Sequence, residues 1–204
     1  MALTFYTNPM SRGRIARWML EEVGVAYETV ILDYASSMKA DAYLSVNPMG
    51  KVPAIVHDGK VVTEGAAICA YLADTFPETG LAPTAAERAA YYRWMFYAAG
   101  PVEAAVTNRS LGVVPSAEQQ RMVGYGSYEM VVDTFAGAVA AHPYIAGDRF
   151  TAADVYAGSQ VIWGVQFGSL PQLPVFEDYV ARVTVRDAYK RAAAIDDALM
   201  APRG

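Results

Sequence analysis

Residues 47–65 read NPMGKVPAIVHDGKVVTEG and combine several strong signals of local structure. Two prolines and a glycine within residues 47–53 exclude a regular helix, because proline lacks an amide hydrogen and pushes the residue before it toward extended geometry. Apolar runs follow at 53–57 and 60–63, and the dipeptide Asp58-Gly59 between them is the strongest short-range signal of a β-hairpin. These residues therefore predict a shaped loop, a hairpin and then a helix.

Strand and helix signals alternate through the first 77 residues. Short β-prone runs indicate strands and apolar residues at helical spacing indicate helices, in the order strand, helix, strand, helix, hairpin, helix. The segments outside the hairpin are a strand at 3–7, a helix from about Ser11 to Gly24, a strand at 27–32, a short helix at 36–44 and a helix from Glu64 to Pro77. This order predicts a compact α/β domain over residues 1–77.

The pattern changes after this domain. Residues 78–84 lack periodicity and contain a glycine and a proline, so we expect a linker there, and residues 85–204 carry no β signal of any length. Three patterns with capping-box spacing each precede a long apolar-periodic stretch, and two shorter helices are expected near 175–185 and 187–199. The three patterns are Thr84-x-x-Glu87, Ser116-x-x-Gln119 and Thr151-x-x-Asp154. The second domain is therefore predicted to be all-helical, with about five helices.

Composition narrows the class of protein. The 204 residues are 54% hydrophobic and 18% charged, which is enough to bury a sizeable core. No apolar run approaches the roughly 18 residues of a membrane span and no signal segment is recognisable, so the prediction is a cytoplasmic protein without membrane contact. The net charge of −5 argues against a nucleic-acid surface.

The metal-binding and thiol residues are few. The single cysteine, Cys69, excludes an intrachain disulfide and a cysteine-built zinc site, and it falls within the helix after Glu64, where it is expected to be a small buried hydrophobe. His57 and His142 have no clustered partners in the sequence, and His57 is expected to be structural. No metal site is predicted.

Three separated motifs and the order of elements resemble the cytosolic glutathione S-transferase family. Residues 47–54 resemble its loop before the third strand, and residues 63–68 resemble its glutamate-bearing start of the third helix. Residues 147–156 are similar to the capping motif of the buried helix in its second domain. The resemblance covers essentially the whole chain and implies a thioredoxin-like N-terminal domain, an all-helical C-terminal domain and glutathione as cosubstrate, with no metal.

The resemblance implies a set of glutathione-binding residues in the loop. The family's proline corresponding to Pro53 is cis, which turns the amide and carbonyl of Val52 outward, where they can pair with the cysteinyl unit of glutathione. Lys51 and Lys39 could each reach the glycyl carboxylate, although lysines on loops are mostly just solvated. A trans proline that simply begins a strand is the alternative interpretation of Pro53.

The start of the following helix is implied to bind the other end of glutathione. Glu64 can bind the γ-glutamyl ammonium, and the amide of Gly65, at the positive end of a helix dipole, can bind the neighbouring carboxylate. The family commonly has serine at the position of Gly65, so this chain keeps the amide and loses a hydroxyl. The alternative for Glu64 is a solvent-facing charge at a helix start.

Catalysis requires the glutathione thiol to ionise at neutral pH. A free thiol has a pKa of about 8.5, and a hydroxyl donor at a helix N-terminus can lower it. Ser11 lies at such a place and resembles the serine of theta-like and related bacterial members, whose beta-class relatives have cysteine there. Tyr6 and Arg12 are the alternative catalytic residues, and helix capping is the alternative role of Ser11.

The predicted function is conjugation of glutathione to an electrophilic carbon of an apolar substrate. The rivals are a glutathione-dependent isomerase, a peroxide or disulfide reductase without a protein cysteine, and a non-catalytic binding or interaction module. The family resemblance implies a homodimer with the helix after Thr84 at the interface. The second substrate is expected to contact aromatic and methionine side chains, although such residues are more often core. These are Met10, Tyr92, Phe96, Tyr97, Trp163 and Phe167.

Overall fold

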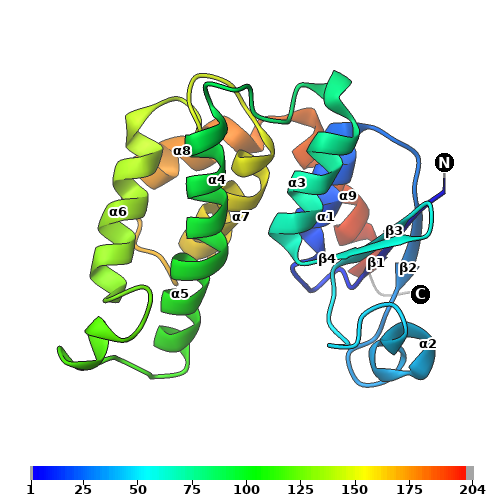
Figure 1. Ribbon diagram of the computed structural model, residues 1–204, viewed down its shortest axis with the longest axis horizontal. Helices are drawn as coiled ribbons and strands as arrows, with labels where there is room; N and C mark the ends of the chain where they lie inside the picture. Colours follow the sequence, from blue (N-terminus) through cyan, green and yellow to red (C-terminus); the bar gives the residue numbers. More distant parts are fainter. Residues whose placement is uncertain (1, 201–204) are drawn as a thin grey trace. The chain divides into compact units, whose positions relative to one another are not determined.

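The structure is a computed structural model that describes residues 2–200 of the chain (Figure 1). It divides into two compact units, of which unit 1 comprises Met1–Ala82 with Val185–Gly204 and unit 2 comprises Pro83–Thr184. The boundary between Ala82 and Pro83 falls inside the linker expected at residues 78–84. Residues 185–200, however, group with unit 1, whereas the sequence pattern assigned them to the helical domain.

A four-stranded mixed sheet forms the centre of unit 1. Its spatial order is β2-β1-β3-β4, with β1 parallel to β2 and antiparallel to β3, and with β3 antiparallel to β4. The strands are β1 (Leu3–Thr7), β2 (Glu28–Ile31), β3 (Ala54–His57) and β4 (Lys60–Thr63). The predicted strands and the hairpin are confirmed, and Asp58 and Gly59 form its turn with positive φ angles of 47° and 78°.

Helices surround this sheet. Those of unit 1 are α1 (Gly13–Val23), the 3-10 turn η1 (Ser37–Lys39), α2 (Asp41–Leu44), α3 (Gly65–Thr75), the 3-10 turn η2 (Pro77–Thr79) and α9 (Asp187–Met200). The predicted short helix at 36–44 is interrupted at Ala40, whose extended backbone (φ −76°, ψ 149°) separates η1 from α2. Gly24 ends α1 as predicted, in the left-handed conformation.

The alternation of side chains along β1 creates two apolar faces. Leu3 and Phe5 are buried on one face, and α1 and α3 pack beside this part of the sheet. Tyr6 points to the opposite face, because successive strand residues alternate. It packs there against a second cluster, which is made of Leu32, Met38, Tyr43 and Ala54. The segment of η1 and α2 therefore covers the face of the sheet that carries Tyr6, and Val52 of the loop at 47–53 packs against the same cluster.

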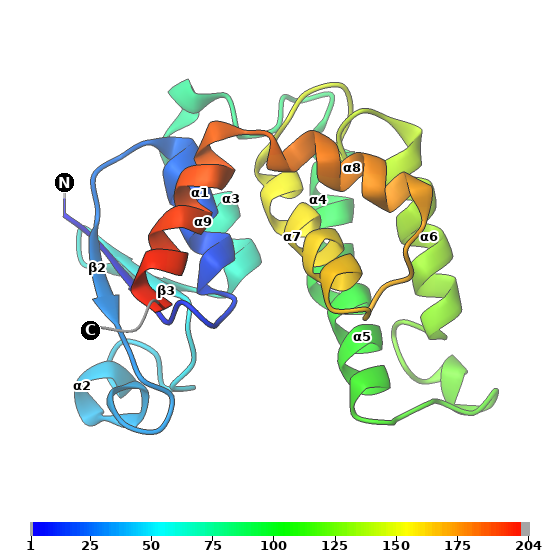
Figure 2. The same cartoon turned by 180° about the vertical axis from the view of Figure 1, so that it is seen from behind.

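The helix α9 lies beside α1 (Figure 2), which explains why the chain end belongs to unit 1. Nε of Arg17 donates to Oδ1 of Asp196 at 2.8 Å, and both side chains are only 1% exposed. Arg186, just before α9, donates to both carboxylate oxygens of Glu22 at 2.7 Å. These pairs join residues more than 160 positions apart, a distance at which helical periodicity carries no information about the partner.

Unit 2 is all-helical within the described residues. Its segments are α4 (Arg88–Tyr97), the π-helical segment η3 (Ala98–Val102), α5 (Glu103–Ser110), the 3-10 turn η4 (Gln119–Arg121), α6 (Tyr128–Ala141), α7 (Ala152–Gln166) and α8 (Pro174–Thr184). The first three follow one another without a break, and Pro101 lies inside the π-helical segment. A proline removes one backbone donor from a helix, which suits a local change in hydrogen-bond pattern.

All three predicted capping boxes form, but not all precede a long helix. Thr84 and Glu87 bond reciprocally at 2.8 and 3.4 Å, and α4 begins directly after Glu87. Thr151 and Asp154 form the box that begins α7, and Asp154 also accepts from the Tyr179 hydroxyl at 2.7 Å. Ser116 and Gln119 bond reciprocally too, at 2.8 and 3.3 Å, but only the three-residue η4 follows. The long helix predicted there is wrong, because glycines at 124 and 126 disfavour it. Helix α6 begins instead after Ser127, whose hydroxyl accepts from the Met130 amide.

Across residues 2–200, no helix is both long and apolar enough to cross a bilayer. The same residues contain no group of three or more histidine, cysteine, aspartate or glutamate side chains arranged to hold a metal ion.

Candidate active site

The turn between β1 and α1 is held to the end of β2 by Asn8. The Asn8 side-chain amide donates to the carbonyl of Leu32 at 2.8 Å, and its Oδ1 accepts from the Met10 amide at 2.9 Å. Asn8 is nearly buried, so this contact is shielded from water. Asn8 therefore gives the turn that carries Ser11 a fixed starting point.

Ser11 lies at the start of α1 and uses its hydroxyl inside the turn. The hydroxyl donates to the carbonyl of Asn8 at 2.6 Å and accepts from the amide of Gly13 at 2.9 Å. The hydroxyl thus bonds the amide of the first residue of α1, whose N-cap position itself is Arg12. A Ser11 that donates to a thiolate would first have to release the Asn8 carbonyl by rotating about its Cα–Cβ bond.

Gly13 is a further residue of this turn that the sequence interpretation missed. A Cβ atom added to Gly13 would lie 1.9 Å from Oγ1 of Thr7 and 2.9 Å from Oγ of Ser11. Any larger residue would therefore displace the Thr7 side chain and crowd that of Ser11. The sequence did contain a signal for this role, namely a glycine two positions after a candidate catalytic serine, where a helix closely approaches a strand.

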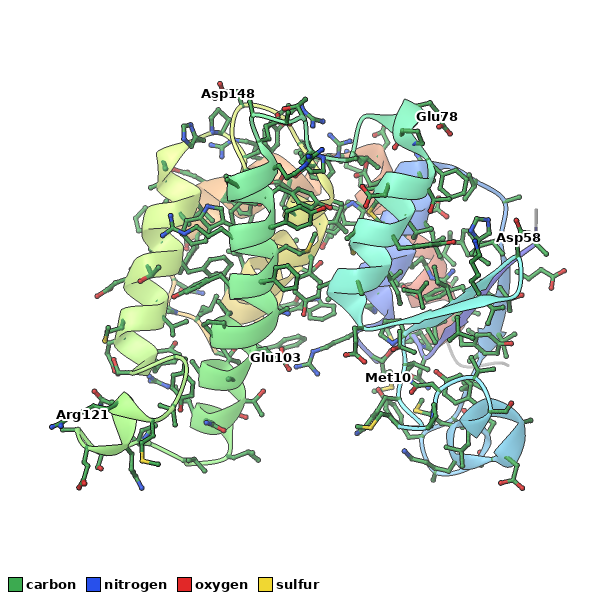
Figure 3. All side chains as sticks on the ribbon, in the orientation of Figure 1. Met10, Asp58, Glu78, Glu103, Arg121 and Asp148 are labelled. Carbon is green, nitrogen blue, oxygen red and sulfur yellow. The ribbon has the colours of Figure 1, made fainter. Side chains whose placement is uncertain are left out.

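The other two candidate catalytic residues lie on either side of this turn, Tyr6 in β1 and Arg12 directly before α1, and their environments differ. The Tyr6 ring is half-buried and packs against the ring of Tyr43, with centroids 5.4 Å apart. Arg12 is exposed and forms the N-cap position of α1. Met10 is 76% exposed at the tip of the turn (Figure 3). Ser11 is thus the candidate whose hydroxyl lies at the first turn of the helix.

The loop at 47–53 is built around the carbonyl of Lys51. The Tyr43 hydroxyl donates to this oxygen at 2.5 Å and the Asn47 side-chain amide at 2.8 Å. Burial raises the pKa of Tyr43 to about 12, so its hydroxyl keeps the proton that it donates. Gly50 has φ 56°, and an added Cβ would lie 2.9 Å from the Met38 carbonyl oxygen, so glycine is required there.

The predicted cis peptide bond between Val52 and Pro53 is confirmed. Val52 is half-buried and packs against the cluster that contains Tyr43. Within residues 2–200, no backbone hydrogen bond to the Val52 amide or carbonyl is formed. The Val52 backbone is therefore available to an added extended peptide.

The two predicted lysines have different surroundings. The Lys39 ammonium donates to the Gly50 carbonyl at 2.6 Å and lies 3.4 Å from that of Met49, so it holds the loop together. An ammonium has three donors, which leaves Lys39 able to bind a ligand carboxylate as well. The Lys51 side chain is exposed, and its ammonium has no ion pair with any residue that the structure describes.

Glu64 has an unusual backbone at the start of α3. Its φ of 66° and ψ of 118° are rarely adopted by a residue with a side chain, and such outliers cost about 1–3 kcal/mol and cluster at functional sites. The carboxylate is exposed and does not cap α3. The amides of Gly65, Ala66 and Ala67 find no acceptor among the described residues, so an anion can bind this helix end.

The residues predicted to line a second-substrate site are partly exposed and partly core. In unit 2, Phe96 and Phe167 are 67% and 74% exposed. Tyr97 is half-buried, donates to the carbonyl of Val131 at 3.2 Å and packs on the Phe135 ring, so it is a packing residue of unit 2. Of the other two residues of unit 2, Tyr92 is 39% exposed and Trp163 is half-buried.

Cys69 and His57 are buried as expected. Cys69 is fully buried in α3, and burial raises the pKa of its thiol, so it is no nucleophile. Nδ1 of His57 lies 2.9 Å from the Tyr71 hydroxyl, and its ring packs near Phe76, which agrees with a structural role.

Comparison with known proteins assigns the family. The model of the "Glutathione S-transferase, N-terminal domain" matches residues 1–74. Glutathione S-transferase GST-4.5 of Xanthomonas campestris pv. campestris is 31% identical over 187 residues, which cover 85% of this chain and 90% of that protein. Maleylacetoacetate isomerase of Rhizobium meliloti is 31% identical over 199 residues, with 89% of each covered. Protein LigF of Sphingobium sp. is 48% identical over 62 residues, but this match spans only 24% of that protein.

Solved structures agree with this assignment. The theta class glutathione S-transferase of Xanthomonas axonopodis pv. citri, with glutathione bound, superimposes with a TM-score of 0.75 at 30% identity, covering 94% of this chain and 97% of that one. The chain therefore belongs to the cytosolic glutathione S-transferase family of enzymes, as its motifs predicted. The thioredoxin-like first part and the helical second part are confirmed with it.

Proposed function

We propose that the protein conjugates glutathione to an electrophilic carbon of an apolar substrate. The observation that carries this proposal is the pairing of an exposed carboxylate at Glu64 with open amides at the start of α3. A γ-glutamyl group presents an ammonium and a carboxylate on one carbon, so it complements an anion placed beside a helix N-terminus. The solved relative with glutathione bound supports the same ligand.

Glutathione is proposed to extend from Glu64 along the loop. Its cysteinyl unit pairs with the Val52 backbone, and its glycyl carboxylate binds the ammonium groups of Lys51 and Lys39. The open backbone of Val52 and the exposed ammonium of Lys51 support this path. Because three separate parts of the peptide are bound, the position of the thiol is determined.

Ser11 is proposed to stabilise the glutathione thiolate. The thiol proton leaves to solvent, and the Ser11 hydroxyl turns from the Asn8 carbonyl to donate to sulfur, assisted by the positive end of α1. In a substitution, sulfur then forms a bond to carbon and the leaving group departs with the electron pair. The contact of the Ser11 hydroxyl with the amide of Gly13, the first residue of α1, supports this role over the half-buried ring of Tyr6.

The proposal extends to the second substrate and to assembly. The exposed rings of Phe96 and Phe167 can bind an apolar electrophile, as can Met10. The protein is proposed to act in the cytoplasm, where glutathione is kept reduced, and to form a homodimer through the helix after Thr84. Sedimentation velocity measures the assembly directly, and a monomer at micromolar concentration would contradict it.

The test combines a binding and a turnover measurement on the full chain. Isothermal titration with glutathione should give one site, and a panel of aryl halides, epoxides, peroxides and disulfides should give turnover with an aryl halide or an epoxide. Methylglutathione, which lacks the thiol, is the control and should bind without turnover. Absence of glutathione binding would overturn the proposal. Binding without turnover on any panel member would instead indicate the non-catalytic module, and turnover of only peroxides or disulfides would indicate a reductase.

A glutathione-dependent isomerase is the second candidate, favoured by the full-length similarity to maleylacetoacetate isomerase of Rhizobium meliloti. In this reaction the thiolate adds to a conjugated double bond, rotation follows about the resulting single bond, and the thiolate is expelled. Glutathione is thereby regenerated. Turnover of a cis-dienoic acid with no net loss of glutathione thiol distinguishes this reaction from conjugation.

A further inference from the structure

Three successive carbonyl groups in the β1–α1 turn are each bound by a different donor. The carbonyl of Asn8 accepts from Ser11, and that of Met10 accepts from the Tyr34 hydroxyl at 3.2 Å. Between them, the carbonyl of Pro9 accepts from Nε of Arg14 at 2.6 Å. The donor to Pro9 is the one that carries a charge, and hydrogen bonds from charged donors are about twice as strong as neutral ones.

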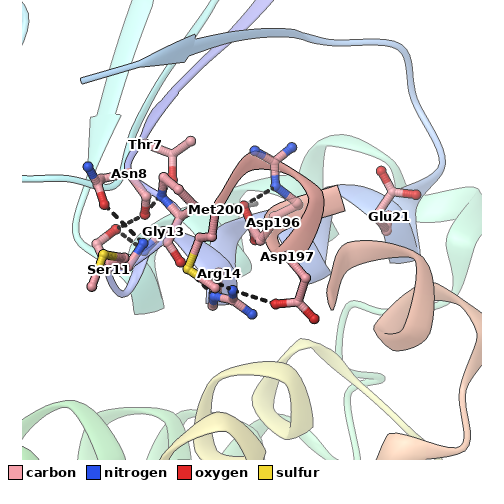
Figure 4. A network of polar contacts seen from close by, with 12 residues as sticks. Thr7, Asn8, Ser11, Gly13, Arg14, Glu21, Asp196, Asp197 and Met200 are labelled. Carbon is pink, nitrogen blue, oxygen red and sulfur yellow. Dashed lines mark hydrogen bonds and ion pairs between the residues drawn. The ribbon is translucent and has the colours of Figure 1, made fainter. Parts of the chain in front are cut away.

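The same guanidinium also reaches the C-terminal helix (Figure 4). Nη2 of Arg14 donates to Oδ1 of Asp197 at 2.7 Å and lies 3.6 Å from the sulfur of Met200. The Arg14 side chain is 25% exposed. A guanidinium is a rigid plane with several donors, so it can fix two acceptors relative to each other. Arg14 thus links the turn that carries Ser11 to residues more than 180 positions further along the chain.

Asp197 is held in place by its neighbour in the sequence. Asp196 forms the buried ion pair with Arg17, one helical turn after Arg14 on α1. Burial raises the pKa of Asp196, while the Arg17 guanidinium opposes that shift. Breaking a buried ion pair by removing one partner is strongly destabilising, so the register of α9 on α1 is fixed. This register places Asp197 next to Arg14, although the Asp197 side chain itself is 62% exposed.

We propose that Arg14 is a positioning residue for thiol activation, which couples the docking of α9 to the conformation of the turn that carries Ser11. This inference rests on the proposed function, because it concerns the thiolate that Ser11 stabilises. Ser11 lies two residues after Pro9, and its hydroxyl must rotate away from the Asn8 carbonyl while the main chain stays in place. A turn that loses its Pro9 contact can move with the side chain, and the donor is then poorly aimed at sulfur.

The decisive experiment compares Arg14→Gln with Arg191→Gln in the full chain. Arg191 also joins α9 to α1, through Nε to Glu21 at 3.1 Å, but it touches no residue of the turn. In Arg14→Gln, the pKa of bound glutathione, followed by thiolate absorbance, should rise by about half a unit to one unit, so that kcat below this pKa falls about three- to tenfold. The KM for glutathione should change less than about twofold. Arg191→Gln should lower Tm without moving the pH profile.

Two further variants separate positioning from charge. Lysine carries its charge on one nitrogen and cannot bind Pro9 and Asp197 in the same way, so Arg14→Lys should not restore the pH profile. Asp197→Asn should shift the profile in the same direction as Arg14→Gln, and the double variant should be no worse than Arg14→Gln alone. Restoration by lysine, or an unshifted profile in Asp197→Asn, would overturn the coupling.

The outcome is distinguishable from failure of the proposed function. If the unaltered protein does not bind glutathione, the proposed function fails before Arg14 is tested. If it binds glutathione with a lowered thiol pKa and Arg14→Gln leaves that pKa unchanged, only the role of Arg14 is refuted. A shift of equal size in Arg191→Gln would likewise refute it, because general loosening of α9 would then be the cause.

Discussion

The β1–α1 turn and the start of α3 both contribute to the candidate site, and they differ in how their polar groups are bonded. In the turn, the hydroxyl of Ser11 and the carbonyls of Asn8, Pro9 and Met10 all have partners within unit 1. At the start of α3, the carboxylate of Glu64 and the first amides of the helix are open to a ligand.

This difference suggests that one region mainly binds glutathione and the other mainly activates its thiol. Groups that are already open can bind a ligand without giving up an internal bond, so the α3 side should contribute most of the affinity for glutathione. Ser11 must exchange one hydrogen bond for another, so its net contribution is the difference between a bond to a carbonyl and a bond to a thiolate. Substitutions on the two sides should therefore change different quantities, namely Kd on one and the thiol pKa on the other.

The largest effect is expected for Glu64→Gln. The substitution keeps the shape but removes the charge that binds the ammonium, and a hydrogen bond to a charged group contributes about 1.5–3 kcal/mol. The Kd for glutathione should rise roughly ten- to hundredfold by isothermal titration. The bound thiol pKa should stay the same, and so should Tm, because the Glu64 carboxylate has no partner to lose among the described residues.

Glu64→Gly is the matched variant for the backbone. Glycine adopts positive φ without strain, so this change should raise Tm while it abolishes the same ammonium contact. A Kd within twofold of the original in both variants would show that Glu64 is only a solvent-facing charge. The start of α3 would then not be the main source of affinity for glutathione.

Ser11→Ala should have the next largest effect, which is on the pKa of the bound thiol rather than on Kd. Loss of a hydroxyl donor to the thiolate should raise the bound thiol pKa by about one unit, which lowers kcat about tenfold at pH values below it. The Kd for glutathione should change little. Tm should also fall, because the bonds to Asn8 and Gly13 are lost together. Absorbance titration of the thiolate measures the first effect independently of the second.

Tyr6→Phe and Arg12→Gln are the controls for this assignment. The phenylalanine keeps the ring that packs on Tyr43 and removes only the hydroxyl. Both variants should leave the thiol pKa unchanged. A shift in either one, with none in Ser11→Ala, would transfer the role of thiol activation to that residue.

How far the sequence predicts this molecule depends on the range of the interactions. The hairpin, the end of α1 at Gly24 and the cis bond before Pro53 follow from local signals and are confirmed. The helix predicted after Ser116 is wrong, although the cap itself forms, since a cap stabilises a helix only where the following residues favour one. Local patterns therefore locate turns better than they determine helix length.

Contacts between distant residues escaped the sequence interpretation. Nothing in the amphipathic pattern of residues 187–199 shows that Asp196 pairs with Arg17, and this pair is one of several contacts that join α9 to α1. Similarly, Lys39 was expected either to bind glutathione or to be solvated, and its bond to the Gly50 carbonyl depends on how the loop folds back. A charged residue can be recognised as a candidate from sequence, but its partner is set by the tertiary structure.

Lys39 and Lys51 test whether the loop at 47–53, like the start of α3, contributes to the affinity for glutathione. Replacement of an exposed partner of the glycyl carboxylate should raise Kd by up to about fivefold, and the effect should shrink with added salt. Lys51→Met should do this with no change in Tm, since its ammonium has no ion pair within residues 2–200. Lys39→Met should also lower Tm, because its bond to the Gly50 carbonyl is lost. Equal Tm values in the two variants would contradict the structural role of Lys39.

The last expected change is a gain, at Gly65. A serine there would add a hydroxyl donor beside the amides that bind the γ-glutamyl carboxylate, and one more hydrogen bond is worth about 0.5–1.5 kcal/mol, so Kd should fall about two- to tenfold. Gly65→Ala is needed as the control, because replacing a helical glycine by alanine or serine favours the helix and should raise Tm. If alanine tightened glutathione binding as much as serine, helix stability rather than the hydroxyl would be responsible. The affinity for glutathione at the start of α3 would then depend on how well its backbone is ordered. The start of α3 and the turn at Ser11 would differ less than their hydrogen bonds suggest.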